Sequence, residues 1–188
     1  MGKFSNEISK AHEAFIAEQH IYFVATAPLA ADGRVNLSPK GLDSFKVLSP
    51  NKVAYMDLIS SGNETSAHTH ENGRITIMFC SFNDKPNILR LYGKGHAVLK
   101  DTEEWNELAP QFTIYASTRQ LIVIDVDLVQ TSCGFGVPMY DYVGERSIHF
   151  DWAATKGEEG LRKYIDEKNL ISLDGLPTDI GLRRANNQ

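Results

Sequence analysis

The stretch Asp57–Phe82, DLISSGNETSAHTHENGRITIMFCSF, carries the pattern on which the predicted fold depends. It opens at the end of an apolar strand and continues into a small polar turn that contains Gly62. Residues 63–72 are predicted to form a helix ended by Gly73, because glycine readily adopts the left-handed conformation of a helix C-terminus. Residues 74–82 are rich in apolar and β-branched side chains and predict a buried strand.

Outside this stretch, the chain has the pattern of short strands separated by turns. Strands are predicted at residues 20–27, 34–38, 52–58, 88–98 and 120–129, and helices at residues 5–16, 103–112 and 158–168. Gly93 and Gly95 predict a bulge or bend in one strand, and Ser5 is the expected N-cap of the first helix. Successive strands with few helices are typical of antiparallel barrels rather than of repeated βαβ units. The predicted fold class is therefore mainly β, an antiparallel barrel of about six strands with peripheral helices.

Length and charge limit the possible functions. A chain of 188 residues suits a single domain, 1–188, with a barrel core at about 20–130 and a C-terminal loop and helix at 131–188. The net charge of −5 and the lack of clustered Lys and Arg argue against a nucleic-acid partner. No apolar run is long enough for a membrane span or a signal peptide. Two cysteines, Cys80 and Cys133, are too few for a disulfide framework, so a cytoplasmic location is expected.

The segment Ser61-Gly-Asn-Glu-Thr65 at the start of the predicted helix has two explanations. In the ordinary one, Ser61 or Asn63 caps the helix and Gly62 forms the turn. In the other, the unpaired N–H groups and partial positive charge of the helix N-terminus bind a phosphate group. Glu64 is unfavourable beside such an anion unless its carboxylate points away. The segment by itself leaves both explanations open.

A second motif, Asn36-Leu-Ser-Pro-Lys-Gly41, supplies a possible counter-charge. Pro39 lacks a backbone N–H group, so this segment is predicted to be an edge strand or a strand end. Lys40 then projects from that end, either into solvent or toward a phosphate group.

Taken in order, three segments resemble the FMN-binding split barrel of the pyridoxamine 5′-phosphate oxidase-like superfamily. They are residues 37–41, residues 55–65, and residues 70–79 running into 89–95, together about a third of the chain. The resemblance implies a six-stranded antiparallel split β-barrel that forms a homodimer and binds FMN. It also implies an oxidoreductase acting on an unidentified small molecule, with the flavin performing the redox chemistry.

The resemblance assigns cofactor-binding roles by position. Phosphate contacts are implied for Lys40, Ser61, Gly62, Asn63 and Thr65, and contacts along the flavin ring for Leu37, Ser38, Pro39, Gly41, Tyr55, Met56 and Asp57. Arg90 lies on a strand that offers a side chain to the cofactor in relatives; its expected partner is Asp57 or the flavin, unless it lies on the outer face. The tail, GLRRANNQ, lacks the substrate-binding Arg-Leu-His-like segment of authentic pyridoxamine-phosphate oxidases. The arginine usual before Lys40 is also missing, so the substrate stays unassigned.

Other motifs give weaker indications. No catalytic side chain is assigned, and a metal site is not expected, because His68 and His70 are two residues apart on a helix and diverge. Residues 132–142, SCGFGVPMYDY, are predicted to form an irregular loop that either packs on the core or covers a flavin face. The alternatives to an FMN oxidoreductase are a non-catalytic flavin-binding or stress-related protein, and a deazaflavin F420- or haem-binding member of the same fold.

Overall fold

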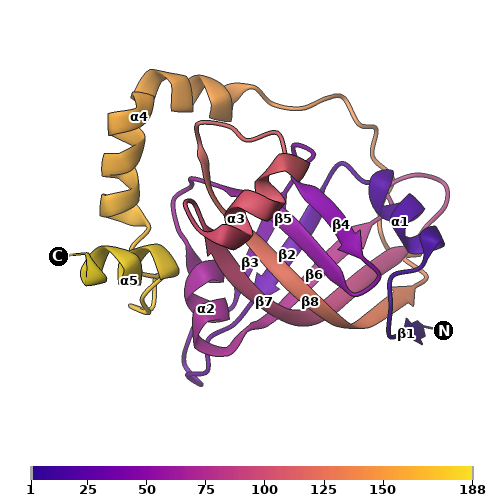
Figure 1. The fold of residues 1–188 in the computed structure, drawn as a ribbon. Helices are drawn as coiled ribbons and strands as arrows, with labels where there is room; N and C mark the ends of the chain where they lie inside the picture. The colour runs from indigo at the N-terminus through magenta and orange to yellow at the C-terminus, as the bar shows by residue number, and fades with distance from the viewer. Residues whose placement is uncertain (1, 188) are drawn as a thin grey trace.

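Eight strands form one antiparallel sheet that curls around an apolar core (Figure 1). The computed structural model describes residues 2–187. The strands are β1 Lys3–Ser5, β2 Tyr22–Thr26, β3 Asn36–Lys40, β4 Phe45–Ser49, β5 Lys52–Leu58, β6 Arg74–Cys80, β7 Ile88–Leu99 and β8 Thr118–Ser132. The helices are α1 Lys10–Ala17, α2 Glu64–Asn72, α3 Glu103–Leu108 with a short 3₁₀ turn at Ala109–Gln111, α4 Ile148–Lys168 and α5 Asp179–Asn186.

The strand order explains why the barrel is split. Neighbouring strands follow the order β3-β2-β6-β7-β8-β5-β4, and β1 pairs with the far end of β8. β3 and β4 are therefore the two ends of the sheet, which agrees with the edge position predicted from Pro39. The mainly β split-barrel prediction is confirmed, but it missed β1 and β4. These strands have three and five residues, too few to show a clear period of two.

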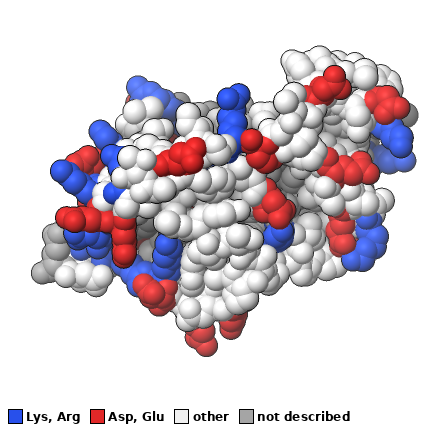
Figure 2. Space-filling model, turned by 90° about the horizontal axis from the view of Figure 1, so that it is seen from above, with Lys and Arg blue, Asp and Glu red and all other residues white. Residues whose placement is uncertain are grey.

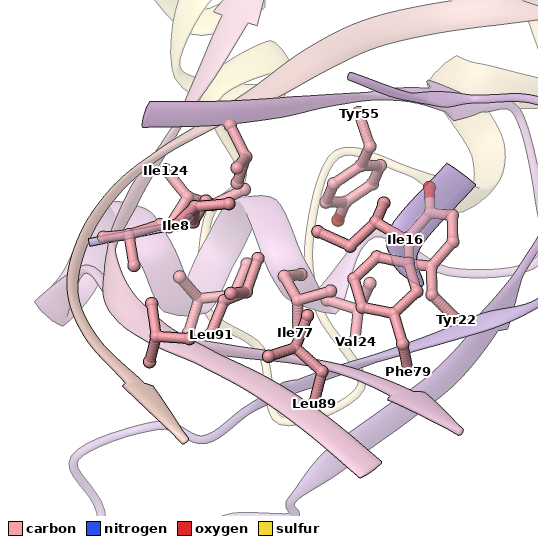
Figure 3. Close-up of a cluster of buried hydrophobic side chains, with 14 of the residues drawn as sticks. Ile8, Ile16, Tyr22, Val24, Tyr55, Ile77, Phe79, Leu89, Leu91 and Ile124 are labelled. Atoms are coloured by element: carbon pink, nitrogen blue, oxygen red, sulfur yellow. The ribbon is translucent and has the colours of Figure 1, made fainter. Parts of the chain in front are cut away.

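The core lies inside the curled sheet (Figure 3). It contains Ile8, Ile16, Tyr22, Val24, Tyr55, Ile77, Phe79, Leu89, Leu91 and Ile124 among its buried side chains. A second apolar cluster, which includes Met56, Leu121 and Val123, lies on the other face of the sheet beneath α3. β8 is thus buried on both faces over residues 118–124, which explains the nearly continuous apolar sequence of this part.

Two helical regions differ from the prediction. Ser9 rather than Ser5 caps the first helix: its Oγ accepts from the backbone N–H of His12 at 3.2 Å, and His12 Nδ1 accepts from the Ser9 N–H at 3.1 Å. Ser5 instead ends β1. The polar tail contains α5, which packs against α2 through Asp179; its carboxylate accepts a hydrogen bond from Ser66 at 2.8 Å.

The segment between β8 and α4 runs across the top of the barrel from the side of α1, and α4 stands beside the sheet (Figure 1). Helix α4 changes direction at Gly157, whose φ of 62° is outside the helical range. No helix within residues 2–187 is long and apolar enough to cross a membrane.

The bulge predicted in β7 lies at Gly93, where the pairing with β8 shifts register after Tyr92. A Cβ atom at Gly93 would lie 2.1 Å from the carbonyl oxygen of Asp125, a backbone atom that cannot move without disturbing β8. Gly93→Ala is therefore expected to lower the free energy of unfolding by about 1–3 kcal/mol, the usual cost of overpacking. Urea denaturation measures this loss.

Gly136→Ala is the matched control, because no atom lies within 4 Å of the Cβ position there. Equal stability of the two variants would contradict the role given to Gly93.

Candidate functional site

The ends of β3 and β5 and the start of α2 enclose a cavity of about 180 Å³. Nine of the predicted cofactor-binding residues line it: Leu37, Ser38, Pro39, Lys40, Asp57, Ser61, Gly62, Asn63 and Thr65. These residues come from two separate segments, 37–41 and 55–65, and the fold brings the two segments together because β3 and β5 end beside the same helix.

A buried ion-pair network forms one wall of this cavity. Asp57 accepts from the Lys40 ammonium at 3.2 Å through Oδ1 and from the Arg119 guanidinium at 2.6 and 3.1 Å through Oδ2. The Asp57 and Arg119 side chains are each only 2% exposed, and that of Lys40 is 19% exposed. Burial alone would raise the pKa of Asp57, but Arg119 and Lys40 outweigh it and hold this pKa at about 2. The carboxylate is therefore ionised at neutral pH, and the three groups together carry one net positive charge.

Polar contacts fix the turn that precedes α2. Gln120 Nε2 donates to Asp57 Oδ2 and to Asn63 Oδ1, both at 2.9 Å. Arg119 donates to the carbonyl of Gly62 at 2.9 Å, and Asn63 Nδ2 donates to the carbonyl of Asn169 at 3.2 Å. Since these contacts hold its side chain, Asn63 sits at the N-cap position without making a side-chain capping bond. The first backbone N–H groups of α2 thus lack the usual side-chain cap.

The C-terminal segment supports the same turn from outside. Asn169 is fully buried and donates from Nδ2 to the carbonyl of Ser60 at 2.9 Å. Together with the bond from Asn63, this joins residues 60–63 to the end of α4. The Glu64 carboxylate accepts from the backbone N–H of Leu173 at 3.2 Å. The start of α2 is therefore held in place by residues more than 100 positions later in the sequence.

A second group of polar contacts joins β3 to α2. Asn36 Nδ2 donates to Thr65 Oγ1 at 3.2 Å and to Thr26 Oγ1 at 3.1 Å. The Thr26 hydroxyl also bonds to Nδ1 of the buried His68 at 3.0 Å. Burial lowers the pKa of His68, so its ring is neutral at pH 7. His70 instead contacts Asp179 at the surface, so the two histidine rings diverge as expected from their spacing.

A larger cavity of about 430 Å³ adjoins the first one. The two share Pro39, Lys40 and Ser60, so Lys40 lies at their boundary. The second cavity is also lined by Gly41, Met56 and residues of the 144–149 segment. Its lining is more apolar than that of the first cavity, which gives the combined groove one polar end and one mixed end.

Two predicted residues lie elsewhere. The Tyr55 side chain points into the barrel core and is fully buried (Figure 3). Arg90 donates to Ser132 Oγ at 3.2 Å, so the expected pairing of Arg90 with Asp57 is wrong. The register explains this: Arg90 is opposite Gln130 of β8, whereas Asp57 is opposite Gln120. Ten residues of β8 separate Gln120 from Gln130, so the two side chains pair with different ends of that strand.

Arg119 is the site residue that the sequence prediction missed. It precedes Gln120 at the start of the most apolar strand, and the prediction began that strand one residue too late to include it. A basic side chain in a strand buried on both faces needs a charged partner, since an unpaired buried charge is costly. This signal was available in the sequence, but it did not identify Asp57 as the partner.

Comparison with known proteins gives one family. The family model described as pyridoxamine 5′-phosphate oxidase matches residues 8–133. The pyridoxamine 5′-phosphate oxidase family protein ustO of Aspergillus flavus is 39% identical over 186 residues, which cover 85% of this chain and 70% of that protein.

Solved structures share the fold at low sequence identity. The crystal structure of HupZ from Group A Streptococcus superposes with a TM-score of 0.53 at 20% identity, covering 66% of this chain and 99% of that chain. An FMN-binding protein from Syntrophomonas wolfei gives a TM-score of 0.51 at 16% identity, covering 71% of this chain and 88% of that chain.

Proposed function

The chain belongs to the pyridoxamine 5′-phosphate oxidase family, and from this premise we propose that it binds FMN as an oxidoreductase. The FMN phosphate lies in the cavity between Lys40 and the start of α2, and the flavin ring lies in the adjoining larger cavity. The observation that carries the proposal is the groove itself, in which a net positive ion-pair network and an uncapped helix N-terminus face the same space.

Each part of the groove has a distinct role in this proposal. Lys40 supplies a charge-assisted hydrogen bond to the phosphate, and Ser61, Asn63, Thr65 and the Gly62 backbone surround it. Asp57 holds Lys40 and Arg119 in place. Its carboxylate is ion-paired to both cations, so the phosphate does not meet an uncompensated negative charge. Ser38, Pro39, Gly41 and Met56, with the backbone of Tyr55, border the ring. FMN when bound supplies the hydride or electron chemistry.

The proposal also includes a homodimer. Arg90 donates to Ser132 and is not among the residues that line either cavity of the groove in its own subunit. In the proposal, a contact between Arg90 and the cofactor is made by a second copy of the chain.

The proposal also places the protein in the cytoplasm, without a nucleic-acid partner. Its two cysteines, Cys80 and Cys133, are both free thiols. On the face seen in Figure 2, the described Lys and Arg residues are interspersed with Asp and Glu and form no continuous basic surface. Such a surface is the usual requirement for binding a phosphate backbone.

A visible spectrum of the purified protein is the first test, because flavin, deazaflavin F420 and haem have different spectra. We expect the yellow spectrum of oxidised flavin, and quenching of FMN fluorescence when FMN is added to the flavin-free protein. A colourless protein that leaves FMN fluorescence unchanged would contradict the proposal. Repeated reduction by NADH or NADPH and reoxidation would distinguish an oxidoreductase from a flavin carrier.

Glu64 opposes the binding of an anion in this arrangement. A Cβ atom at Gly62 would lie 2.3 Å from Glu64 Oε2, so the carboxylate sits directly over the turn at the start of α2. Glu64→Gln is expected to raise FMN affinity about two- to fivefold, since a charge near a helix N-terminus is worth ~0.3–1 kcal/mol. Glutamine retains an oxygen that can accept from Leu173. Fluorescence titration measures the change.

Glu71→Gln is the matched control, because Glu71 lies at the other end of α2 and accepts from the Leu29 N–H. An equal gain in both variants would show that net charge, and not the position of Glu64, sets the affinity.

A further inference from the structure

A cavity of about 680 Å³ lies outside the proposed cofactor groove. It is lined by residues that link α1 to β2 and by residues 140–145 of the segment between β8 and α4. Figure 1 shows this segment crossing the top of the barrel. We propose that this cavity binds the substrate, and that the substrate is an organic cation with an apolar or aromatic body. The inference rests on the proposed function, which it extends by naming a substrate class.

Aromatic side chains form much of the cavity wall. Phe82 and Tyr140 have ring centroids 5.6 Å apart, and His20 and Tyr142 stack at 3.6 Å with an interplanar angle of 8°. Phe23 of β2 adds a further ring. The faces of aromatic rings attract cations through their quadrupoles, most strongly when several rings surround one charge. The rings also provide the apolar contact area that a small organic ligand needs.

The charged residues of the lining are all acidic. They are Glu18, Asp141 and Glu145, and no Lys or Arg is among the described residues that line the cavity. The cofactor groove differs in the charge of its lining, because Lys40 and Arg119 face the ligand space there. A phosphorylated or carboxylated substrate would meet like charges in this cavity, whereas an ammonium group would meet opposite ones.

The two cavities adjoin. His20, Ile21 and Glu145 line both the 680 Å³ cavity and the 430 Å³ cavity assigned to the flavin ring. Glu145 also accepts a hydrogen bond from the Tyr142 hydroxyl at 2.9 Å, within the same segment. A ligand in the acidic cavity is therefore positioned next to a ring held beside Lys40. This proximity is what a substrate site requires.

Two probes with the same ring and opposite charge test the inference by calorimetric titration of the flavin-free protein. Benzyltrimethylammonium is expected to bind at least tenfold more tightly than benzenesulfonate. Tyr140→Leu is expected to weaken binding of the cation about two- to thirtyfold, the range for a lost cation–π contact. The double variant Asp141→Asn with Glu145→Gln is expected to weaken it about two- to twentyfold.

The same segment and the sheet provide matched controls. Phe135→Leu removes a ring that is 81% exposed and lies outside the cavity lining, and Asp127→Asn removes an exposed carboxylate of β8. Both are expected to bind the cation as the native protein does. Equal binding of the two probes, no binding of the cation, or equal losses in the control variants would overturn the inference.

A parallel FMN titration separates this inference from the proposed function. Cation binding without FMN binding would support the acidic aromatic cavity and contradict the flavoprotein proposal. FMN binding with no preference for the cation would support the flavoprotein proposal and contradict the inference that the acidic aromatic cavity binds a cation.

Discussion

The Asp57→Asn variant is expected to be less stable than the native protein by about 3–5 kcal/mol, the usual loss when one partner of a buried ion pair is removed. The Arg119 side chain is 2% exposed and makes two hydrogen bonds to the Asp57 carboxylate. Asparagine would leave this guanidinium charge buried without a counter-charge and would also remove the partner of Lys40. Urea denaturation at neutral pH measures the loss.

Asp125→Asn provides the control. Its carboxylate lies 3.3 Å from the Lys52 ammonium, but its side chain is 63% exposed. A surface pair of this kind contributes about 0–1 kcal/mol. Similar losses in the two variants would show that burial of the Asp57 network adds nothing to stability.

Acid titration is a second test of how the Asp57 ion-pair network contributes to stability. The pKa of Asp57 falls from its ordinary 3.8 to about 2 in the folded protein, so the folded state holds this carboxylate ionised more strongly than the unfolded state. The resulting stabilisation, about 2 kcal/mol, is fully present above pH ~4 and is lost as the pH falls through ~2. The native protein should show this loss, and the Asp57→Asn variant should lack it.

The Lys40→Ala variant is expected to weaken FMN binding by about 1.5–3 kcal/mol, or roughly ten- to 150-fold, the contribution of a hydrogen bond to a charged group. Lys40 lies at the boundary of both cavities of the groove and is the more exposed of the two cations that contact Asp57. Asp57 keeps Arg119 as a partner in this variant, so the fold should persist. Fluorescence titration of flavin-free protein gives the affinity, and thermal denaturation checks the fold.

Lys46→Ala is the matched control for Lys40. Lys46 lies on β4, the next strand along the chain, and pairs with the exposed Asp43 at 3.1 Å, outside the groove. Its loss should leave FMN affinity unchanged. If Lys40→Ala also bound FMN with native affinity, Lys40 would have no place in the phosphate site.

The fold class was predictable because its signals are local. The alternating and continuous apolar patterns gave β5 to β8, and Gly73 marked the end of α2 in the left-handed conformation, with a φ of 74°. Gly93 likewise marked the bulge of β7. Strands β1 and β4 and the start of α1 were missed. β1 has only three residues, β4 does not alternate between buried and exposed positions, and Ser5 and Ser9 are both acceptable N-caps.

The candidate site was predictable only in part, because its contacts join distant segments. Lys40 and the 61–65 turn were found from residue types that suit a phosphate, and they line one cavity. The pairing of Arg119 with Asp57 depends on which strands are neighbours, since β5 and β8 are separated by more than 50 residues but lie side by side. The expected pairing of Arg90 with Asp57 failed for the same reason. The distance between these residues is set by the register of β8, which single-strand patterns do not contain.

Asn169 gives the chain's C-terminal region a part in shaping the proposed phosphate site. The amide that secures the turn before α2 belongs to a residue outside the 8–133 span shared with the family model. Two relatives with the same barrel but different extensions would therefore present this turn in different shapes. Sequence changes in the C-terminal extension would then alter which ligands the site binds without changing the strands of the barrel.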